Sequence, residues 1–378
     1  MRFSKFSTMT INDDIIDSAH MAENKDQDAE EEILSHTEDE EEIEEVGEID
    51  EENEPLPVQY RGTIIPDPDV QKIDADSELT AGYDLDVDYL ELIHLKIGSI
   101  KDLKLSRFQK LESLCLRQNL ITSIVDVIDI NENLEELDLY DNRINHISSN
   151  IGRFKKLTNL DLSFNKIKNI KNLENLTELK DLYFVQNNIR EIKNLENNTK
   201  ITNLELGGNK IEVISETMNK MLNMEKLWLG KNRISKFENL HNLKNLKILS
   251  IQANRIEKLE GLENLVNLEE LYVANNRITK IENLDKNVNL QVIDISSNGL
   301  EHLSGMTHLK KLTDFWCSYN KISDFNEINE QLGKLPELDT VYFEGNPVQL
   351  TNPTAYRRKI KLNLGPSLAK IDATYVHN

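Results

Sequence analysis

The stretch that decides the fold of this 378-residue chain is Leu134-Glu-Glu-Leu137-Asp-Leu139-Tyr-Asp-Asn142-Arg-Ile144-Asn-His-Ile147. It places apolar side chains and one asparagine at fixed offsets, and the same pattern returns along most of the sequence. Intervals of 22 or 23 residues, and a last one of 26, separate Asn119, Asn142, Asn165, Asn187, Asn209, Asn232, Asn254, Asn276, Asn298, Asn320 and Asn346. Eleven matches in phase leave almost no room for chance, so the chain consists of stacked repeats.

Each position of the pattern has a physical role. Leu137 and Leu139 are alternate residues of a short strand, so their side chains point to the same side. Leu134 and Ile144 come from the flanking turns and fill the same interior. A single repeat cannot surround its own apolar residues, so neighbouring repeats must stack on it. Asn142 sits where the chain leaves the strand, and its amide can satisfy backbone groups that the stack buries.

This pattern is typical of leucine-rich repeats. It predicts an α/β solenoid with a curved parallel β-sheet on the concave face, short helical turns on the convex face and a C-terminal helical cap. We expect twelve repeats of about 22 residues over 86–346. The first is degenerate, because Leu95 stands where asparagine is expected.

The ends of the chain differ from the repeats. In residues 347–378, Tyr356, Ile360 and Leu364 form one apolar helix face, and Asn352 is the expected helix cap. Residues 55–85 are expected to be a linker that covers the first repeat.

Residues 1–54 are expected to be a disordered acidic tail. Residues 26–54 hold 17 of the acidic residues and no Lys or Arg, so they account for most of the formal charge of −23. One interpretation is a solubilising tail. The other is a regulatory tail phosphorylated at Ser35 and Thr37, which each precede a glutamate by three residues.

The sequence contains no motif for catalysis. We find no nucleophile elbow, phosphate loop, clustered cysteines or metal-spaced histidine pair, so we expect no enzyme activity, no cofactor and no metal. Cys115 and Cys317 lie nine repeats apart, so disulfides are excluded and a reducing compartment is expected. No apolar run approaches the roughly 20 residues of a membrane span.

The residue between the two strand leucines points away from the core. These residues form one row: Cys115, Asp138, Asp161, Tyr183, Glu205, Trp228, Ser250, Tyr272, Asp294, Trp316 and Tyr342. Five are aromatic, four are acidic and none is basic, which favours a protein partner that presents Arg or Lys beside apolar pockets. A nucleic acid is not expected, because its phosphates require cations.

The sequence closely resembles the leucine-rich-repeat regulatory subunit family of type-1 protein phosphatase (regulatory subunit 7), as a fungal-like member. The resemblance covers about 86–378. It rests on Leu114-Cys-Leu-Arg-Gln-Asn-Leu-Ile121, Glu136-Leu-Asp-Leu-Tyr-Asp-Asn142, Leu227-Trp-Leu-Gly-Lys-Asn232, Phe315-Trp316, Tyr356-Arg-Arg-Lys-Ile360 and Ile371-Asp-Ala-Thr374.

The resemblance implies a non-catalytic subunit of the nucleus and cytoplasm that binds the phosphatase catalytic subunit through its concave face. It implies control of phosphatase activity, maturation and mitotic targeting, and an inhibitor-3-type protein in a ternary complex. The family's contact positions carry over to Asp161, Tyr183, Glu205, Trp228, Asp294, Asp314, Trp316 and Tyr342; the row adds Tyr272. Tyr183 and Trp228 replace phenylalanine, and Asp314 replaces glutamate. The alternative is a general scaffold of the same fold in another complex, such as a ribonucleoprotein.

Overall fold

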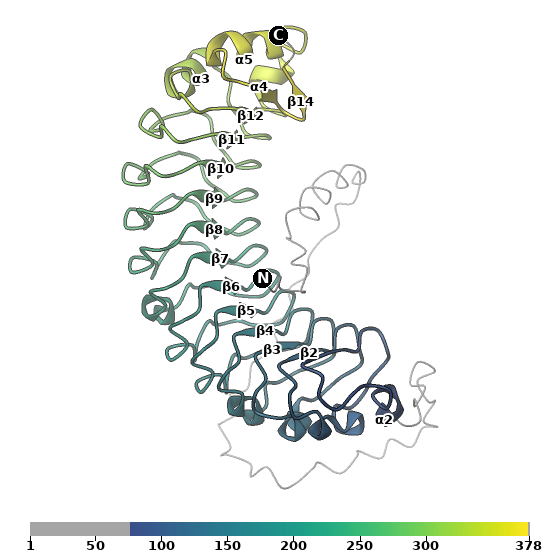
Figure 1. The fold of residues 1–378 in the computed structure, drawn as a ribbon. Helices are drawn as coiled ribbons and strands as arrows, with labels where there is room; N and C mark the ends of the chain where they lie inside the picture. The colour runs from purple at the N-terminus through teal and green to yellow at the C-terminus, as the bar shows by residue number, and fades with distance from the viewer. Residues whose placement is uncertain (1–75, 377–378) are drawn as a thin grey trace, which may run out of the picture. The chain divides into compact units, whose positions relative to one another are not determined.

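The structure, a computed structural model, describes residues 76–376 (Figure 1). The expectations for residues 1–54, for most of 55–85 and for the phosphorylation of Ser35 and Thr37 lie outside these residues.

One sheet runs through the repeats. Its strands follow chain order from β1 to β14, and every neighbouring pair from β1 to β13 is parallel. The first twelve strands are β1 Tyr89–Glu91, β2 Ser113–Cys115, β3 Glu136–Asp138, β4 Asn159–Asp161, β5 Asp181–Tyr183, β6 Asn203–Glu205, β7 Lys226–Trp228, β8 Ile248–Ser250, β9 Glu270–Tyr272, β10 Val292–Asp294, β11 Asp314–Trp316 and β12 Thr340–Tyr342.

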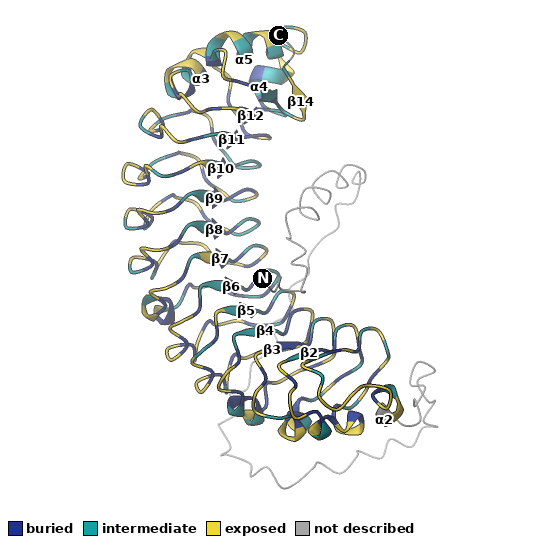
Figure 2. Ribbon diagram, in the orientation of Figure 1, coloured by how far each residue is buried: buried dark blue, intermediate teal, exposed yellow. Residues whose placement is uncertain are grey.

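The central residue of each strand and the apolar residue that follows the strand reach the interior. Leu137 pairs with Leu160 across β3 and β4, and both are at most 1% exposed. Equivalent residues of all the repeats join into one continuous core. Figure 2 shows buried residues along the inside of the coil and exposed residues on the outer loops.

Short helical turns lie opposite the sheet. They are the 3-10 helices η1 Lys101–Leu103, η2 Leu105–Arg107, η3 Val125–Asp129, η4 Ser149–Arg153 and η5 Glu216–Lys220. Figure 1 shows the strands on the inner side of the curve and these turns on the outer side. The predicted leucine-rich-repeat solenoid is therefore confirmed.

The asparagines form a ladder of hydrogen bonds between repeats. The Asn232 side-chain Nδ2 donates to the carbonyl oxygens of Leu206 in the previous repeat, at 3.0 Å, and of Leu229 in its own, also at 3.0 Å. Its Oδ1 accepts from the backbone N–H of Ile211 at 3.0 Å. The same pattern holds at Asn142. Each amide thus satisfies buried backbone groups of two adjacent repeats.

The described part of the N-terminal segment packs on the first repeat. Helix α2 (Asp76–Leu79) leads into Thr80, which is fully buried. The Thr80 hydroxyl donates to the Leu103 carbonyl oxygen at 3.0 Å and accepts from Arg107 Nη2 at 2.6 Å. Within 76–376 no repeat precedes the first one, and these bonds attach the N-terminal segment to that side of it.

The C-terminal cap contains α3 (Phe325–Leu332), α4 (Pro347–Leu350), α5 (Tyr356–Leu364) and a hairpin of β13 (Lys370–Ile371) and β14 (Thr374–Tyr375). The apolar face of α5 is buried, as expected. The expected cap at Asn352 is wrong, because α5 begins at Tyr356 and has Ala355 at its N-cap. The Asn352 carbonyl oxygen accepts from the Tyr356 N–H, so residues 352–356 form a turn before the helix. The Asn352 side-chain Oδ1 accepts from Lys359 Nζ.

Asp372 closes the end of the sheet. In earlier repeats, the residue after the strand donates its N–H to a carbonyl of the next strand, as Leu139 does to Asp161. After β12 the carboxylate oxygen Oδ1 of Asp372 takes this place, accepting from the N–H of Phe343 at 3.0 Å and of Glu344 at 3.1 Å. A side-chain oxygen of the residue after β13 thus takes the place of the backbone carbonyl that accepts in earlier repeats.

Candidate protein-interaction face

The last residues of β2 to β12 form the interaction row, the same eleven residues that the sequence places between the strand leucines. In-register pairing sets each row residue beside the next, as with Asp294 and Trp316. Eight predicted site residues lie in this row: Asp161, Tyr183, Glu205, Trp228, Tyr272, Asp294, Trp316 and Tyr342. The ninth, Asp314, begins β11 in the flanking row formed by the first residues of the strands.

The row is less exposed than an open sheet face, because each side chain is flanked by its neighbours. Tyr272 is only 7% exposed and Asp294 8%, whereas Trp228 and Trp316 are half-buried. Cys115 occupies its row position but is buried at 1%. The row is therefore a shallow, partly desolvated surface.

The N-terminal half of the row is acidic. Burial, with the Asp161 charge next, raises the pKa of Asp138 to about 7 despite an ion pair to Arg117 Nη1 at 3.5 Å. Burial likewise raises the pKa of Glu205 to about 7, again with the Asp161 charge as the next cause. Burial also raises the pKa of Asp161 itself. A cation arriving from a partner stabilises the ionised form of all three.

The C-terminal half of the row is aromatic. The Trp316 ring centroid lies 6.3 Å from that of Tyr272 and 5.9 Å from that of Tyr342. Lys370 Nζ sits 5.5 Å from the Tyr342 ring centroid. The Trp316 indole N–H is buried and has no hydrogen-bond partner among residues 76–376. Asp294 lies between Tyr272 and Trp316, and its carboxylate accepts from the Ser296 N–H at 3.1 Å.

Two features beside the row were not predicted. Arg117 lies 4.1 Å above the Tyr140 ring, which in turn packs 4.8 Å from the ring of Phe164. Asn203, in the flanking row, hydrogen-bonds to both Tyr183 and Trp228. The first residue of each strand also faces outward, so the period of two could have located Asn203 but not its bonds.

Within 76–376, no cluster of His, Cys, Asp and Glu could hold a metal ion, and no helix is long and apolar enough to span a membrane. His302 Nδ1 contacts Glu327 Oε1 at 2.8 Å, and His308 Nε2 lies 3.0 Å from the Leu284 carbonyl oxygen. Both histidines therefore have structural partners.

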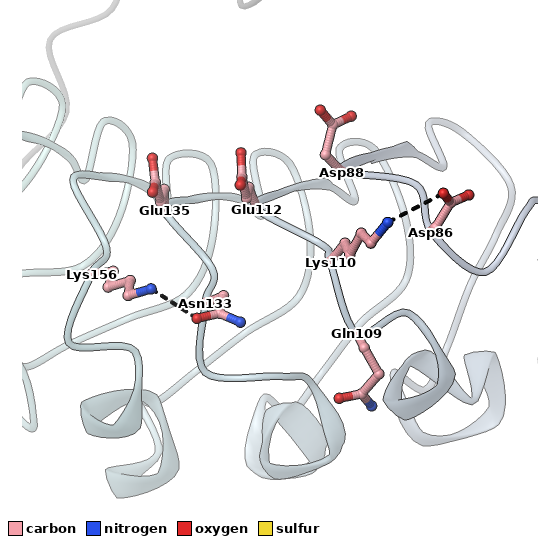
Figure 3. Close-up of a pocket in the computed structure, with 8 residues that line it drawn as sticks. All are labelled: Asp86, Asp88, Gln109, Lys110, Glu112, Asn133, Glu135 and Lys156. Atoms are coloured by element: carbon pink, nitrogen blue, oxygen red, sulfur yellow. Dashed lines mark hydrogen bonds and ion pairs between the residues drawn. The ribbon is translucent and has the colours of Figure 1, made fainter.

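A shallow polar hollow lies beside the first strands (Figure 3). Its lining is Asp86, Asp88, Gln109, Lys110, Glu112, Asn133, Glu135 and Lys156. Lys110 Nζ pairs with Asp86 Oδ2 at 3.3 Å, and Lys156 Nζ donates to Asn133 Oδ1 at 2.8 Å. It lacks the apolar walls that small-molecule sites have.

Comparison with known proteins agrees with this geometry. The family description "Leucine Rich repeats (2 copies)" matches residues 222–264 and 266–305, and "Leucine Rich Repeat" matches 133–154. The protein phosphatase 1 regulatory subunit SDS22 of Saccharomyces cerevisiae is 56% identical over 331 residues, which are 87% of this chain and 98% of that one. This chain belongs to the SDS22 family of protein phosphatase 1 regulatory subunits. The family is one of regulators, in agreement with the prediction that the chain is not an enzyme.

Two further relatives fit this assignment. The Schizosaccharomyces pombe SDS22 regulatory subunit is 52% identical over 94 residues, 25% of this chain and 27% of that protein. An internalin of Listeria monocytogenes shares the fold with a TM-score of 0.61 at 21% identity, over 80% of this chain and 89% of that one. At that identity the internalin supports the solenoid fold alone.

Proposed function

We propose that the chain binds the catalytic subunit of type-1 protein phosphatase through the interaction row and thereby controls its activity. The observation that carries this proposal is the in-register row itself, with three of its four carboxylates in the N-terminal half and three of its five aromatic rings in the C-terminal half. Membership in a family of phosphatase regulatory subunits supports the choice of partner.

The size of the row fits a protein surface. Asp161 on β4 and Tyr342 on β12 are eight strand steps apart, which at the usual spacing is about 38 Å. A face of this length matches a protein interface and exceeds any metabolite. Because the row has no basic residue, it is matched to a partner surface with Arg or Lys beside apolar side chains.

The two halves of the row have different tasks in this proposal. The aromatic half supplies large rings whose burial accounts for most of the affinity, as in other interface hot spots. The acidic half pairs with cations of the partner and sets its orientation.

The wider role extends this proposal, with the family resemblance as its support. We further propose that the chain takes part in phosphatase maturation and mitotic targeting, forms a ternary complex with an inhibitor-3-type protein, and resides in the nucleus and cytoplasm.

The test is size-exclusion chromatography of the full chain mixed with the purified catalytic subunit. We expect co-elution for the wild type and a weakened complex for Tyr342→Ala. Leu222→Ala is the matched control, because Leu222 is an apolar residue 54% exposed outside the row. Separate elution of the wild-type proteins would refute the proposal, and equal binding by Tyr342→Ala would refute the use of this face.

A further inference from the structure

Asn203 connects two aromatic side chains of the interaction row. It begins β6, the strand between β5 and β7, and so lies between Tyr183 and Trp228. Its Nδ2 donates to the Tyr183 hydroxyl at 3.2 Å. Its Oδ1 accepts from the Trp228 indole N–H at 3.1 Å. One amide therefore holds one ring on each side of its own strand.

The orientation of this amide is fixed by chemistry. An indole N–H can only donate, so the atom facing Trp228 must be the Asn203 oxygen. The amide nitrogen must then face Tyr183, whose hydroxyl accepts. The Tyr183 hydroxyl retains its own proton for a further acceptor.

The two rings flank Glu205, which lies between them in the row. Lys226, beside Asn203 in the flanking row, lies close enough to favour the ionised form of Glu205, but the two side chains form no ion pair among the described residues. A carboxylate between two aromatic rings suits a cationic side chain, which can pair with the carboxylate and lie against the rings.

We propose that Asn203 is a positioning residue that holds Tyr183 and Trp228 as the two walls of a slot for an Arg or Lys side chain of the partner, with Glu205 at its floor. This inference rests on the proposed binding face and adds a residue that does not itself pair with the cation. Without Asn203 both rings lose their polar anchor and sample other rotamers, so the slot is no longer preformed.

Two comparisons within the chain show that this bridge is specific. Asn159 has the same strand position two repeats earlier, and its side chain makes no hydrogen bond to an aromatic residue of the row. Trp316 has the same row position as Trp228 four repeats later, yet its indole N–H has no hydrogen-bond partner in the described part of the chain. Asn159 is therefore a matched control for Asn203, and Trp316 shows that a row tryptophan does not require such a bond.

The first arm of the test uses fluorescence and needs no partner. The chain has two tryptophans, so Trp316→Phe leaves Trp228 as the only one. In that background, Asn203→Leu should at least double the acrylamide quenching constant of Trp228, whereas Asn159→Leu should leave it unchanged. Asn203→Asp keeps an acceptor for the indole and can accept from the Tyr183 hydroxyl, so it should restore the low quenching.

The second arm measures affinity for the type-1 phosphatase catalytic subunit by calorimetry. Asn203→Leu should weaken binding about tenfold, a change expected when a preformed contact is lost. In the Tyr183→Phe/Trp228→Phe background, which already lacks both bonds, adding Asn203→Leu should change the affinity less than about twofold, since the coupling has been removed.

The outcomes separate the two proposals. If the wild type does not bind the phosphatase, the proposed function fails, and the quenching arm alone decides whether Asn203 holds the rings. If the wild type binds and Asn203→Leu changes neither quenching nor affinity, Asn203 is not a positioning residue. An equal loss of affinity in the double-phenylalanine background would also contradict it, because the effect would then not pass through the rings.

Discussion

At the scale of single residues, one amide side chain makes the repeat possible. Asn232 is 9% exposed and bonds to backbone groups of two repeats. The sequence predicted this role because the asparagine returns with the period of the fold. It could not reveal that one of the accepting carbonyl groups belongs to Leu206 of the previous repeat, 26 positions earlier in the chain.

We expect Asn232→Ala to lower the free energy of unfolding by about 1–3 kcal/mol, because it leaves buried backbone groups unpaired. Urea denaturation measures this difference. Asn159→Ala is the control, and it should change stability much less. An Asn232→Ala protein as stable as the wild type would show that the ladder contributes nothing.

The burial and the pKa of the row carboxylates cannot be predicted from residue identity alone. The sequence placed Glu205 on the outward side of a strand but gave no measure of its burial. Burial between neighbouring side chains raises its pKa to about 7, far above the value of about 4.3 for an unfolded chain. The folded protein therefore binds this proton more tightly than the unfolded chain does.

This shift predicts a pH dependence of stability. The contribution of Glu205 is fully present below about pH 4 and is lost as pH rises through about 7. Glu205→Gln does not titrate, so its stability relative to wild type should increase between about pH 4 and pH 7 and then level off. Urea denaturation at several pH values tests this, with the exposed Glu257→Gln as control. A constant difference between Glu205→Gln and wild type would contradict the raised pKa.

At the scale of elements, the strands are easier to predict from the sequence than the C-terminal cap. The alternation of Leu137, Asp138 and Leu139 identifies β3 and its outward residue, because side chains of a strand alternate. The cap has no repeat to reveal it. The β13–β14 hairpin and the start of α5 depend on contacts with the last repeat, so Asn352 was assigned as a cap that the structure does not have.

A substitution at Asp372 tests how the end of the sheet is stabilised. Its carboxylate accepts from two N–H groups after β12 and from the Tyr356 hydroxyl at 3.1 Å. We expect Asp372→Ala to destabilise the protein by about 2–3 kcal/mol, because these donors lose their acceptor. Tyr356→Phe, which removes one of the three bonds, should have a smaller effect. Thermal unfolding followed by circular dichroism distinguishes them, and an Asp372→Ala protein that melts like the wild type would refute this closing role.

At the scale of the whole molecule, stacking converts a weak local pattern into a long binding face. A single outward residue such as Asp161 says little, but in-register pairing aligns it with Tyr183 and the rest of the row. The order of the row could therefore be predicted from the sequence. The aromatic contacts around Trp316 and the Asn203 bridge could not, because they depend on side-chain rotamers across neighbouring strands.

Residues 1–54, the acidic tail, contribute no side chain to the interaction row, which runs from Cys115 to Tyr342. A truncated chain that starts at Pro55 should bind the phosphatase with the affinity of the full chain, because the row remains intact. Calorimetric titration of both chains tests this. A tenfold weaker truncated chain, equivalent to about 1.4 kcal/mol, would show that the segment takes part in binding.

Calorimetric titration of the phosphatase catalytic subunit into wild-type and Trp316→Ala chains measures directly whether the interaction row binds the phosphatase. Trp316 lies outside the continuous core and between two row aromatics, so its loss should weaken binding by about 2–4 kcal/mol and leave the fold intact. Lys231→Ala, at an exposed turn, should bind like the wild type. A Trp316→Ala protein that binds normally but unfolds at lower urea concentration would contradict the account, because the ring would then stabilise the fold and not the complex.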